Sequence, residues 1–350
     1  MGLSSASCIE CGDFFPAAEV ECGESNRMMM YKSQYKSSLA FLTSNLILPS
    51  VQPDTQFLRF RDIQTINEMS PPTTDPEPHA IQANKTPDGI TIITINRPHR
   101  RNAVDIPTSR KLRAAFVDFE QDPTQKVAIL AGSNGTFCAG FDLQFLSETP
   151  DPNTNPKDGD TNLHPVKDNN PGPMGPSRMQ LRKPLIAAVS GFAVAGGLEL
   201  SLLGDMRVVE EDAVFGVFCR RFGVPLIDGG TARLQKIVGL GRALDMILTG
   251  RPVKADEALS MGLANRVVRK GKALEEAVFI ARQLLDFPQG CMNGDRASAY
   301  HAAYEAKSFE DALRFEFENG LKAIVNESIN GAKRFASGEG KHGRFGKAKL

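Results

Sequence analysis

The chain has 350 residues, which is enough to form one large domain or two smaller ones. Lysine plus arginine and aspartate plus glutamate number 41 each, so no net charge attracts nucleic acid or an anionic membrane surface. Hydrophobic residues make up 41% of the chain, yet no apolar run reaches the roughly 18 to 20 residues of a membrane-spanning helix, and we expect a soluble globular protein.

Residues 1–80 differ in character from the rest of the chain. They show no sustained hydrophobic period, and the stretch SPPTTDPEPHA at 70–80 is polar and rich in proline. Such segments bury too little apolar surface to fold, so we expect a disordered extension that ends in a linker. Five acidic residues among the first 24 argue against a mitochondrial presequence, which is rich in arginine and poor in acids.

The next part of the chain alternates between strand and helix patterns. GITIITINRP at 89–98 alternates in hydrophobicity and is rich in Ile and Thr, which predicts a strand. Asp105 can cap a helix that carries Pro107 in its first turn and ends near residue 120. Strands alternating with helices imply crossover connections and an α/β fold. Three more strands are predicted over 126–132, 184–191 and 206–209, and one more helix over 193–205.

A long insertion and a helical region complete the pattern. Residues 147–177 are rich in Pro, Asp, Asn and Gly, and loops of this length inside a domain are usually functional or disordered. After residue 228 the chain is mostly helical, with two short helices hinged at 239–241 and another near 274–285. Ser308 and Asp311 form the capping-box start of a further helix. This C-terminal region is expected to be a helical subdomain whose apolar faces could also contact other subunits.

Two strand-to-helix turns contain small residues, Gly and Ala, that leave their backbone bare of large side chains. GTFCAGFDL at 135–143 and SGFAVAGGLEL at 190–200 each follow a buried strand and lead to the start of a helix. The first N–H groups of a helix are unpaired and carry a partial positive charge. Two such turns facing each other would aim two amides at one point, as an oxyanion hole does. The alternative is that the small residues only allow a helix and a strand to pack closely.

Glu199 stands directly after the small residues of the second turn, inside a leucine-rich run. A buried carboxylate is costly unless it is paired, hydrogen-bonded or neutralised, so this position indicates a function. In a partly dry pocket its pKa would rise toward the range of a general acid or base. The alternative is an exposed residue of the first helical turn, favoured by the helix dipole.

The cysteines and histidines do not predict a metal site. The six cysteines are too widely spaced for a disulfide scaffold, which favours reduced thiols. Cys8 and Cys11 could form half of a zinc site, but the second pair is missing. The five histidines are scattered along the chain.

Four segments in this order resemble the signatures of the crotonase superfamily, the enoyl-CoA hydratase/isomerase group. They are ITINRPHRRNAVD, FCAGFDL, AAVSGFAVAGGLELSLLGDMRV and GVPLIDGGTARL, and the resemblance spans about residues 80–343. It implies a spiral of repeated ββα units over 81–270, a helical region over 271–350, and assembly as trimers or dimers of trimers. It implies no metal or redox cofactor. Coenzyme A enters as part of the substrate.

The resemblance also assigns roles to residues. Ala139 and Gly196 would supply the two amides that hold the thioester oxygen, and Glu199 matches the first catalytic glutamate of the hydratases. Arg100 and Arg101 are candidate partners of the coenzyme A phosphates, and the alternative is that they belong to a solvated basic loop. The residues implied to contact the substrate and its coenzyme A are Arg101, Ala103, Val104, Ala139, Gly140, Phe141, Asp142, Leu143 and Gly196.

The sequence departs from the hydratase pattern at the second glutamate. That position is Cys219, and a thiol is a poor substitute for a carboxylate at neutral pH. Asp228, at the start of the next helix, could act as a second acid, base or nucleophile, or could cap that helix. Hydration of a 2-enoyl-CoA is therefore the first expectation, followed by double-bond isomerisation and then by hydrolysis or dehalogenation through Asp228. A scaffold that binds CoA without catalysis is the expectation from another class.

The last three residues bear on location. Ala348, Lys349 and Leu350 resemble the peroxisomal address whose type form is Ser-Lys-Leu. The expected location is the peroxisome in a eukaryotic host and the cytoplasm otherwise. A basic tail that ends in leucine by chance is the alternative.

Overall fold

A six-stranded sheet forms the centre of the computed structural model, which describes residues 75–148, 163–167 and 170–338. The strand order is β1, β2, β3, β4, β6, β9, with β1 antiparallel to β2 and every other neighbouring pair parallel. The strands are β1 Ile81–Lys85, β2 Ile90–Ile95, β3 Val127–Gly132, β4 Leu185–Val189, β6 Met206–Glu210 and β9 Arg266–Val268.

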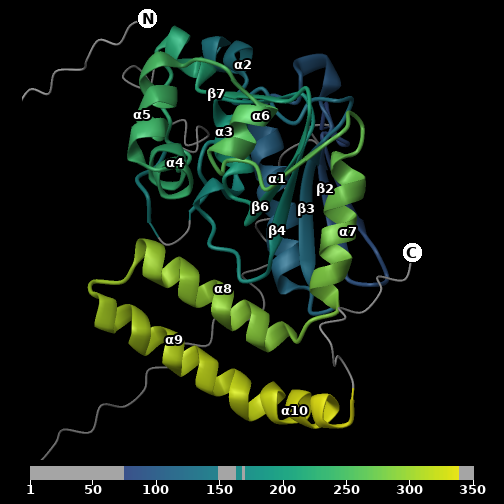
Figure 1. Ribbon diagram of the computed structural model, residues 1–350. Helices are drawn as coiled ribbons and strands as arrows, with labels where there is room; N and C mark the ends of the chain where they lie inside the picture. The colour runs from purple at the N-terminus through teal and green to yellow at the C-terminus, as the bar shows by residue number, and fades with distance from the viewer. Residues whose placement is uncertain (1–74, 149–162, 168–169, 339–350) are drawn as a thin grey trace, which may run out of the picture. The chain divides into compact units, whose positions relative to one another are not determined.

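Helices cover both faces of this sheet. α1 (Ile106–Gln121) buries its apolar side in the cluster that contains Leu130 of β3. α7 (Ala273–Leu285) lies along β2, β3 and β4 on the other side, where it packs against Ile129 (Figure 1). Because both faces are covered, β3 and β4 are apolar almost without interruption instead of alternating.

A second, three-stranded sheet carries the second of the two turns. β5 (Phe192–Val194) is parallel to β7 (Val214–Gly216), which is antiparallel to β8 (Val253–Lys254). The remaining helices are α2 Leu143–Glu148, α3 Gly196–Ser201, α4 Gly230–Val238, α5 Leu240–Thr249, α6 Ala255–Ser260, α8 Gln289–Tyr304, α9 Phe309–Ala323 and α10 Ile329–Ala336. The α/β class and the helical C-terminal region expected from the sequence are confirmed.

Several local predictions are confirmed at the level of single hydrogen bonds. Asp105 caps α1 by accepting from the amide of Thr108 at 2.9 Å, and Ser308 caps α9 by accepting from the amide of Asp311 at 3.1 Å. Gly239, with φ of +83°, separates α4 from α5 as the hinge requires.

Other local predictions are corrected. The helix expected over 193–205 is shorter, because the first residues of that range belong to strand β5. Strand β1, which begins at Ile81 directly after the stretch interpreted as a linker, is an element that the sequence analysis does not predict. Residues 1–74, most of the insertion at 147–177, and the last twelve residues lie outside the described residues.

Candidate active site

The two turns predicted to face each other are in contact. Gly140 in the first turn has φ of +101°, a conformation that side chains disfavour. A Cβ at this position would lie 2.8 Å from the Cβ of Ala195 and 3.0 Å from the amide nitrogen of Gly196. Glycine is therefore required at residue 140, because only bare backbone allows the first turn to reach the second.

The amide of Ala139 is not available for a substrate, which corrects its assigned role. It donates to the carbonyl of Arg101 at 3.1 Å. On the same edge, Val104 donates to the carbonyl of Gly140 at 2.8 Å and accepts from the amide of Asp142 at 2.9 Å. The N–H of Phe141 lies between these two bonds along the chain. No hydrogen bond engages that N–H within the described ranges, so Phe141 replaces Ala139 as the free amide of this turn.

The amide of Gly196 opens α3 and is also free. Ala195, which precedes it, adopts φ of +54° and ψ of −127°, a conformation that costs an alanine about 1 to 3 kcal/mol. The bond from the Ala195 amide to the carbonyl of Gly216, at 2.9 Å, holds this turn on strand β7. In the part of the chain that the structure describes, no group accepts from the N–H of Gly196. Both Phe141 and Gly196 line the same cavity.

Glu199 is buried in the first turn of α3, with 2% of its surface exposed. Its Oε1 accepts from the amide of Asp228 at 2.9 Å and from the amide of Gly230 at 2.8 Å. Burial, followed by the negative charge of Asp228, raises the pKa of Glu199 to about 8. This carboxyl therefore holds a proton at neutral pH. Among the described residues no hydrogen bond engages its Oε2, so this oxygen is free to transfer the proton. The alternative of an exposed first-turn glutamate is wrong.

The raised pKa of Glu199 predicts that the fold loses stability as pH rises. Near pH 4.5, its ordinary pKa, the unfolded chain begins to ionise, while the folded state keeps the proton up to about pH 8. The folded state therefore binds more protons across this window, and its free energy of unfolding should fall by an amount on the order of 5 kcal/mol. Urea titrations of the wild type and of Glu199→Gln at about pH 5 and about pH 8 measure this difference. An equal decline in both proteins would contradict it.

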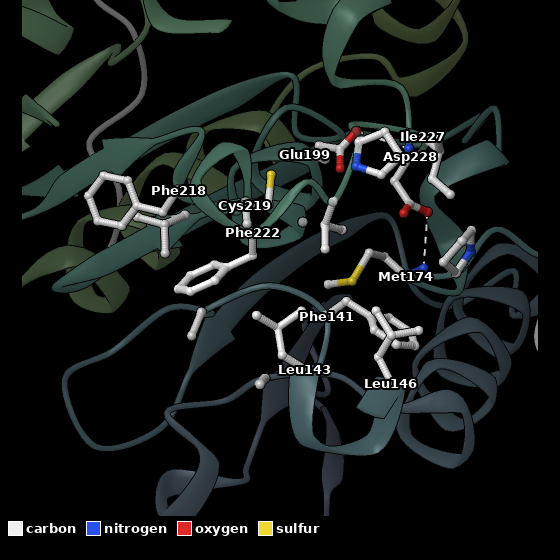
Figure 2. Close-up of a pocket in the computed structure, with 18 of the residues that line it drawn as sticks. Phe141, Leu143, Leu146, Met174, Glu199, Phe218, Cys219, Phe222, Ile227 and Asp228 are labelled. Carbon is white, nitrogen blue, oxygen red and sulfur yellow. Dashed lines mark hydrogen bonds between the residues drawn. The ribbon is translucent and has the colours of Figure 1, made fainter. Parts of the chain in front are cut away.

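Asp228 lies beside Glu199 and is 3% exposed. Its Oδ1 accepts from the amide of Met174 at 3.0 Å (Figure 2) and from the hydroxyl of Ser177. The helix-capping alternative is wrong, because the N-cap of α4 is Gly229, at φ of +93°, and no side chain caps it. Burial raises the pKa of Asp228, while the hydrogen bonds from Ser177 and Met174 oppose this effect.

The two carboxyls share a cavity of about 830 Å³. Cys219, at the position that the resemblance assigned to a second glutamate, also lines it and is 6% exposed. Burial and the charge of Glu199 raise the pKa of this thiol, so it remains protonated. The second ionisable group with a proton to exchange near Glu199 is therefore Asp228. Most of the wall is apolar, including Phe141, Leu143, Leu146, Met174, Phe218, Phe222 and Ile227 (Figure 2).

The residues implied to contact coenzyme A divide into two groups. Those on the cavity wall are Arg101, Ala103, Ala139, Phe141, Leu143 and Gly196. Val104, Gly140 and Asp142 are not on it, which corrects their assignment. Val104 is fully buried in the core, and Gly140 packs against Ala195. Asp142 instead accepts from buried Arg97 at 3.2 Å, while Arg100 lies 3.9 Å from the same carboxylate.

Sequence reasoning missed three residues of the site. Gly230 donates to Glu199, and a Cβ there would lie 2.8 Å from Cγ of that glutamate. Met174 and Ser177 belong to the long insertion and reach Asp228 over more than fifty residues. A glycine after Asp228 was a visible signal, but no local pattern marks a methionine amide or a serine hydroxyl as a partner of a distant carboxylate.

Two further findings concern metals and membranes. Within residues 75–148, 163–167 and 170–338, no group of three or more His, Cys, Asp or Glu side chains could hold a metal ion. Cys8 and Cys11 lie outside these ranges. The helices in the same ranges are all too short or too polar to cross a membrane.

Comparisons with known proteins found a matching family model, similar relatives and similar solved structures. A family model described as enoyl-CoA hydratase/isomerase matches residues 85–336. The chain is 34% identical to an Arabidopsis thaliana protein named probable enoyl-CoA hydratase 1, peroxisomal, over 69% of this chain and 94% of the relative. It is 37% identical to a carnitinyl-CoA dehydratase of Salmonella typhi over 55% of this chain and 70% of the relative. A crystal structure of an enoyl-CoA hydratase from Mycobacterium tuberculosis superposes with a TM-score of 0.66 at 29% identity, covering 74% of this chain and 96% of that one.

Proposed function

Because the chain belongs to the enoyl-CoA hydratase/isomerase family, we propose that it adds water across the double bond of a 2-enoyl-CoA thioester. One observation carries the proposal. Two free amides, from Phe141 and Gly196, and two buried carboxyls, Glu199 and Asp228, line one cavity. This combination fits a reaction that builds negative charge on a carbonyl oxygen and moves a proton beside it.

The amides of Phe141 and Gly196 would bind the thioester oxygen. When a nucleophile adds to C3 of the substrate, electrons move through C2 to this oxygen and form an enolate. Amides fixed before the reaction stabilise that charge without reorganising, and one such donor is typically worth about 3 to 4 kcal/mol. Bare backbone at Gly140 and the strained turn at Ala195 serve to hold the two N–H groups in place.

The two carboxyls would divide the proton transfers. We assign Asp228 the role of base, because its carboxyl accepts hydrogen bonds from Met174 and Ser177 and lies near the charges of Arg178 and Arg233, all of which favour its ionised form. It takes a proton from water as the water oxygen bonds to C3. Glu199, protonated at neutral pH, gives its proton to C2.

Double-bond isomerisation is the second candidate. The observation that favours it is Cys219, since a buried thiol that stays protonated leaves no carboxylate at the second-glutamate position. In that reaction a carboxyl removes a proton from one carbon of a 3-enoyl-CoA and returns it to another, while the same amides hold the enolate.

Mass spectrometry distinguishes these reactions in one experiment. The purified protein is incubated with crotonyl-CoA, with a 3-enoyl-CoA and with a panel of other acyl-CoA thioesters. We expect a product of crotonyl-CoA heavier by one water. An unchanged mass with a moved double bond would identify an isomerase, and loss of the acyl group or of a halide would identify a hydrolase or dehalogenase. Binding of CoA without turnover on the whole panel would contradict the proposal and support a scaffold.

Assembly and location extend this proposal. We propose that the chain forms a trimer or a dimer of trimers, which is supported by apolar side chains left exposed on α9 and the turn after it. They include Phe309, Phe317 and Val325 at 80%, 68% and 66% exposure. Import into the peroxisome of a eukaryotic host is supported by the peroxisomal name of the Arabidopsis relative. The tail at Ala348–Leu350 lies outside the described residues.

A further inference from the structure

The carboxyl of Asp228 is held asymmetrically. Its Oδ1 accepts two hydrogen bonds, from the amide of Met174 at 3.0 Å and from the hydroxyl of Ser177. Its Oδ2 accepts none from any described residue, although Asp228 lines the cavity. Figure 2 shows the bond from Met174 to one oxygen of Asp228, while the other oxygen has no bond to the residues drawn. Only one oxygen of this carboxyl is therefore free for proton transfer.

Ser177 is buried and is held in place by neighbouring residues. It is 2% exposed, in the short 3-10 turn Pro176–Arg178. A Cβ at Gly172 would overlap the hydroxyl of Ser177 and lie 2.7 Å from Oδ1 of Asp228. A side chain at residue 172 therefore does not fit beside this hydrogen bond. Arg233 of α4 donates to the carbonyl of Ser177 at 2.7 Å and to the carbonyl of Asp228 at 3.2 Å. One guanidinium thus fixes the main chains of both residues.

We propose that Ser177 is a positioning residue whose hydroxyl fixes Oδ1 of Asp228 and so presents Oδ2 to the substrate as the oxygen that moves a proton. This role rests on the proposed function for the identity of the reaction, but the hydrogen bond and its effect on Asp228 do not depend on which thioester is used. Ser177 does not line the cavity, so its proposed role is to position Asp228 and not to contact the substrate.

The charged surroundings of Asp228 decide the direction of the expected effect. Glu199 of α3, Arg178 of the 3-10 turn and Arg233 of α4 are the ionisable groups that act on it from the neighbouring elements. The hydrogen bond from Ser177 lowers the pKa of Asp228 against the rise caused by burial. Losing that bond leaves the other effects in place, so Asp228 should take up its proton at higher pH.

The test compares Ser177→Ala with Ser177→Cys and Ser298→Ala in the full chain. Ser298 is a matched control, because it is 7% exposed and bonds only to the carbonyl of Gly294, at 2.9 Å, on α8. Infrared difference spectra across pH follow the protonated carboxyl band of Asp228, which is identified by its loss in Asp228→Asn. Steady-state kinetics with crotonyl-CoA give kcat and KM over the same pH range.

For Ser177→Ala we expect the Asp228 titration to move to higher pH, together with a fall in kcat of about 10- to 100-fold at little change in KM. The acid limb of the pH–rate profile should move in the same direction. Ser177→Cys, a weaker donor, should give a smaller change and serves if the alanine variant does not fold. Ser298→Ala should match the wild type. An unchanged titration in both Ser177 variants would overturn the role of Ser177, whereas a shifted titration in a protein that turns over no thioester would instead contradict the proposed function.

Discussion

Glu199→Gln is expected to lower kcat by about 10²- to 10⁴-fold, the usual contribution of a general acid or base. The amide oxygen of glutamine can still accept from the amides of Asp228 and Gly230, so the turn that holds residue 199 is preserved. What is lost is the exchangeable proton, since an amide does not release one at neutral pH. KM should change little, because residue 199 is expected to act on the transferred proton and not on coenzyme A.

A second buried glutamate provides the control for this variant. Glu210 on β6 is 3% exposed and accepts from the hydroxyl of Ser190 at 2.8 Å, but it does not line the cavity. Glu210→Gln should therefore keep kcat near the wild-type value even if it costs stability. Kinetics of both variants at the pH optimum make the comparison. A Glu199→Gln protein with wild-type kcat would show that another group moves the proton.

Gly140→Ala should reduce kcat by about 10²- to 10³-fold, as expected when one donor of an oxyanion hole is misplaced. The new Cβ would lie 2.8 Å from the Cβ of Ala195, which is closer than real Cβ atoms approach, and 3.0 Å from the nitrogen of Gly196, which is a tight contact. The two turns must then move apart, and the amides of Phe141 and Gly196 can no longer meet at one oxygen. The positive φ adds a loss of roughly 1 to 2 kcal/mol in stability.

Gly135→Ala separates these two effects. Gly135, the first residue of the same turn, also has a positive φ, +68°, but a Cβ there would meet nothing within 4 Å. This variant should lose a similar amount of stability from backbone strain and keep its activity. Thermal unfolding and kcat are measured for both variants. Equal activity in the two would mean that the contact between the turns is not needed for catalysis.

The sequence predicts best those features that depend on neighbouring residues. The cap of α1 at Asp105 needs only a carboxylate three residues before an amide, and the break at Gly239 needs only a glycine with a positive φ. The buried strands are predictable because long apolar runs fit a sheet that is covered on both faces. Contact between the two turns follows from their bare backbone and from the order of the family motifs.

The predictions from sequence fail where a site depends on the direction of an N–H group or on a contact between residues far apart in the chain. Ala139 and Phe141 lie on either side of Gly140, whose positive φ interrupts the extended backbone, and only the bonds to Arg101 and Val104 show which N–H faces inward. Asp142 is polar and follows the turn directly, but its charge is taken up by Arg97, 45 residues earlier. Ser177 reaches Asp228 across 51 residues from an insertion without regular pattern. Such pairings come from the fold as a whole.

The central claim is that the amides of Phe141 and Gly196 hold a single substrate oxygen. A crystal structure with butyryl-CoA, a saturated thioester that has no double bond to hydrate, tests it most directly. We predict the thioester oxygen within about 2.7 to 3.1 Å of both nitrogens, with Ala139 still bonded to Arg101. A thioester oxygen bound elsewhere, or bound by Ala139 in place of Phe141, would contradict the account.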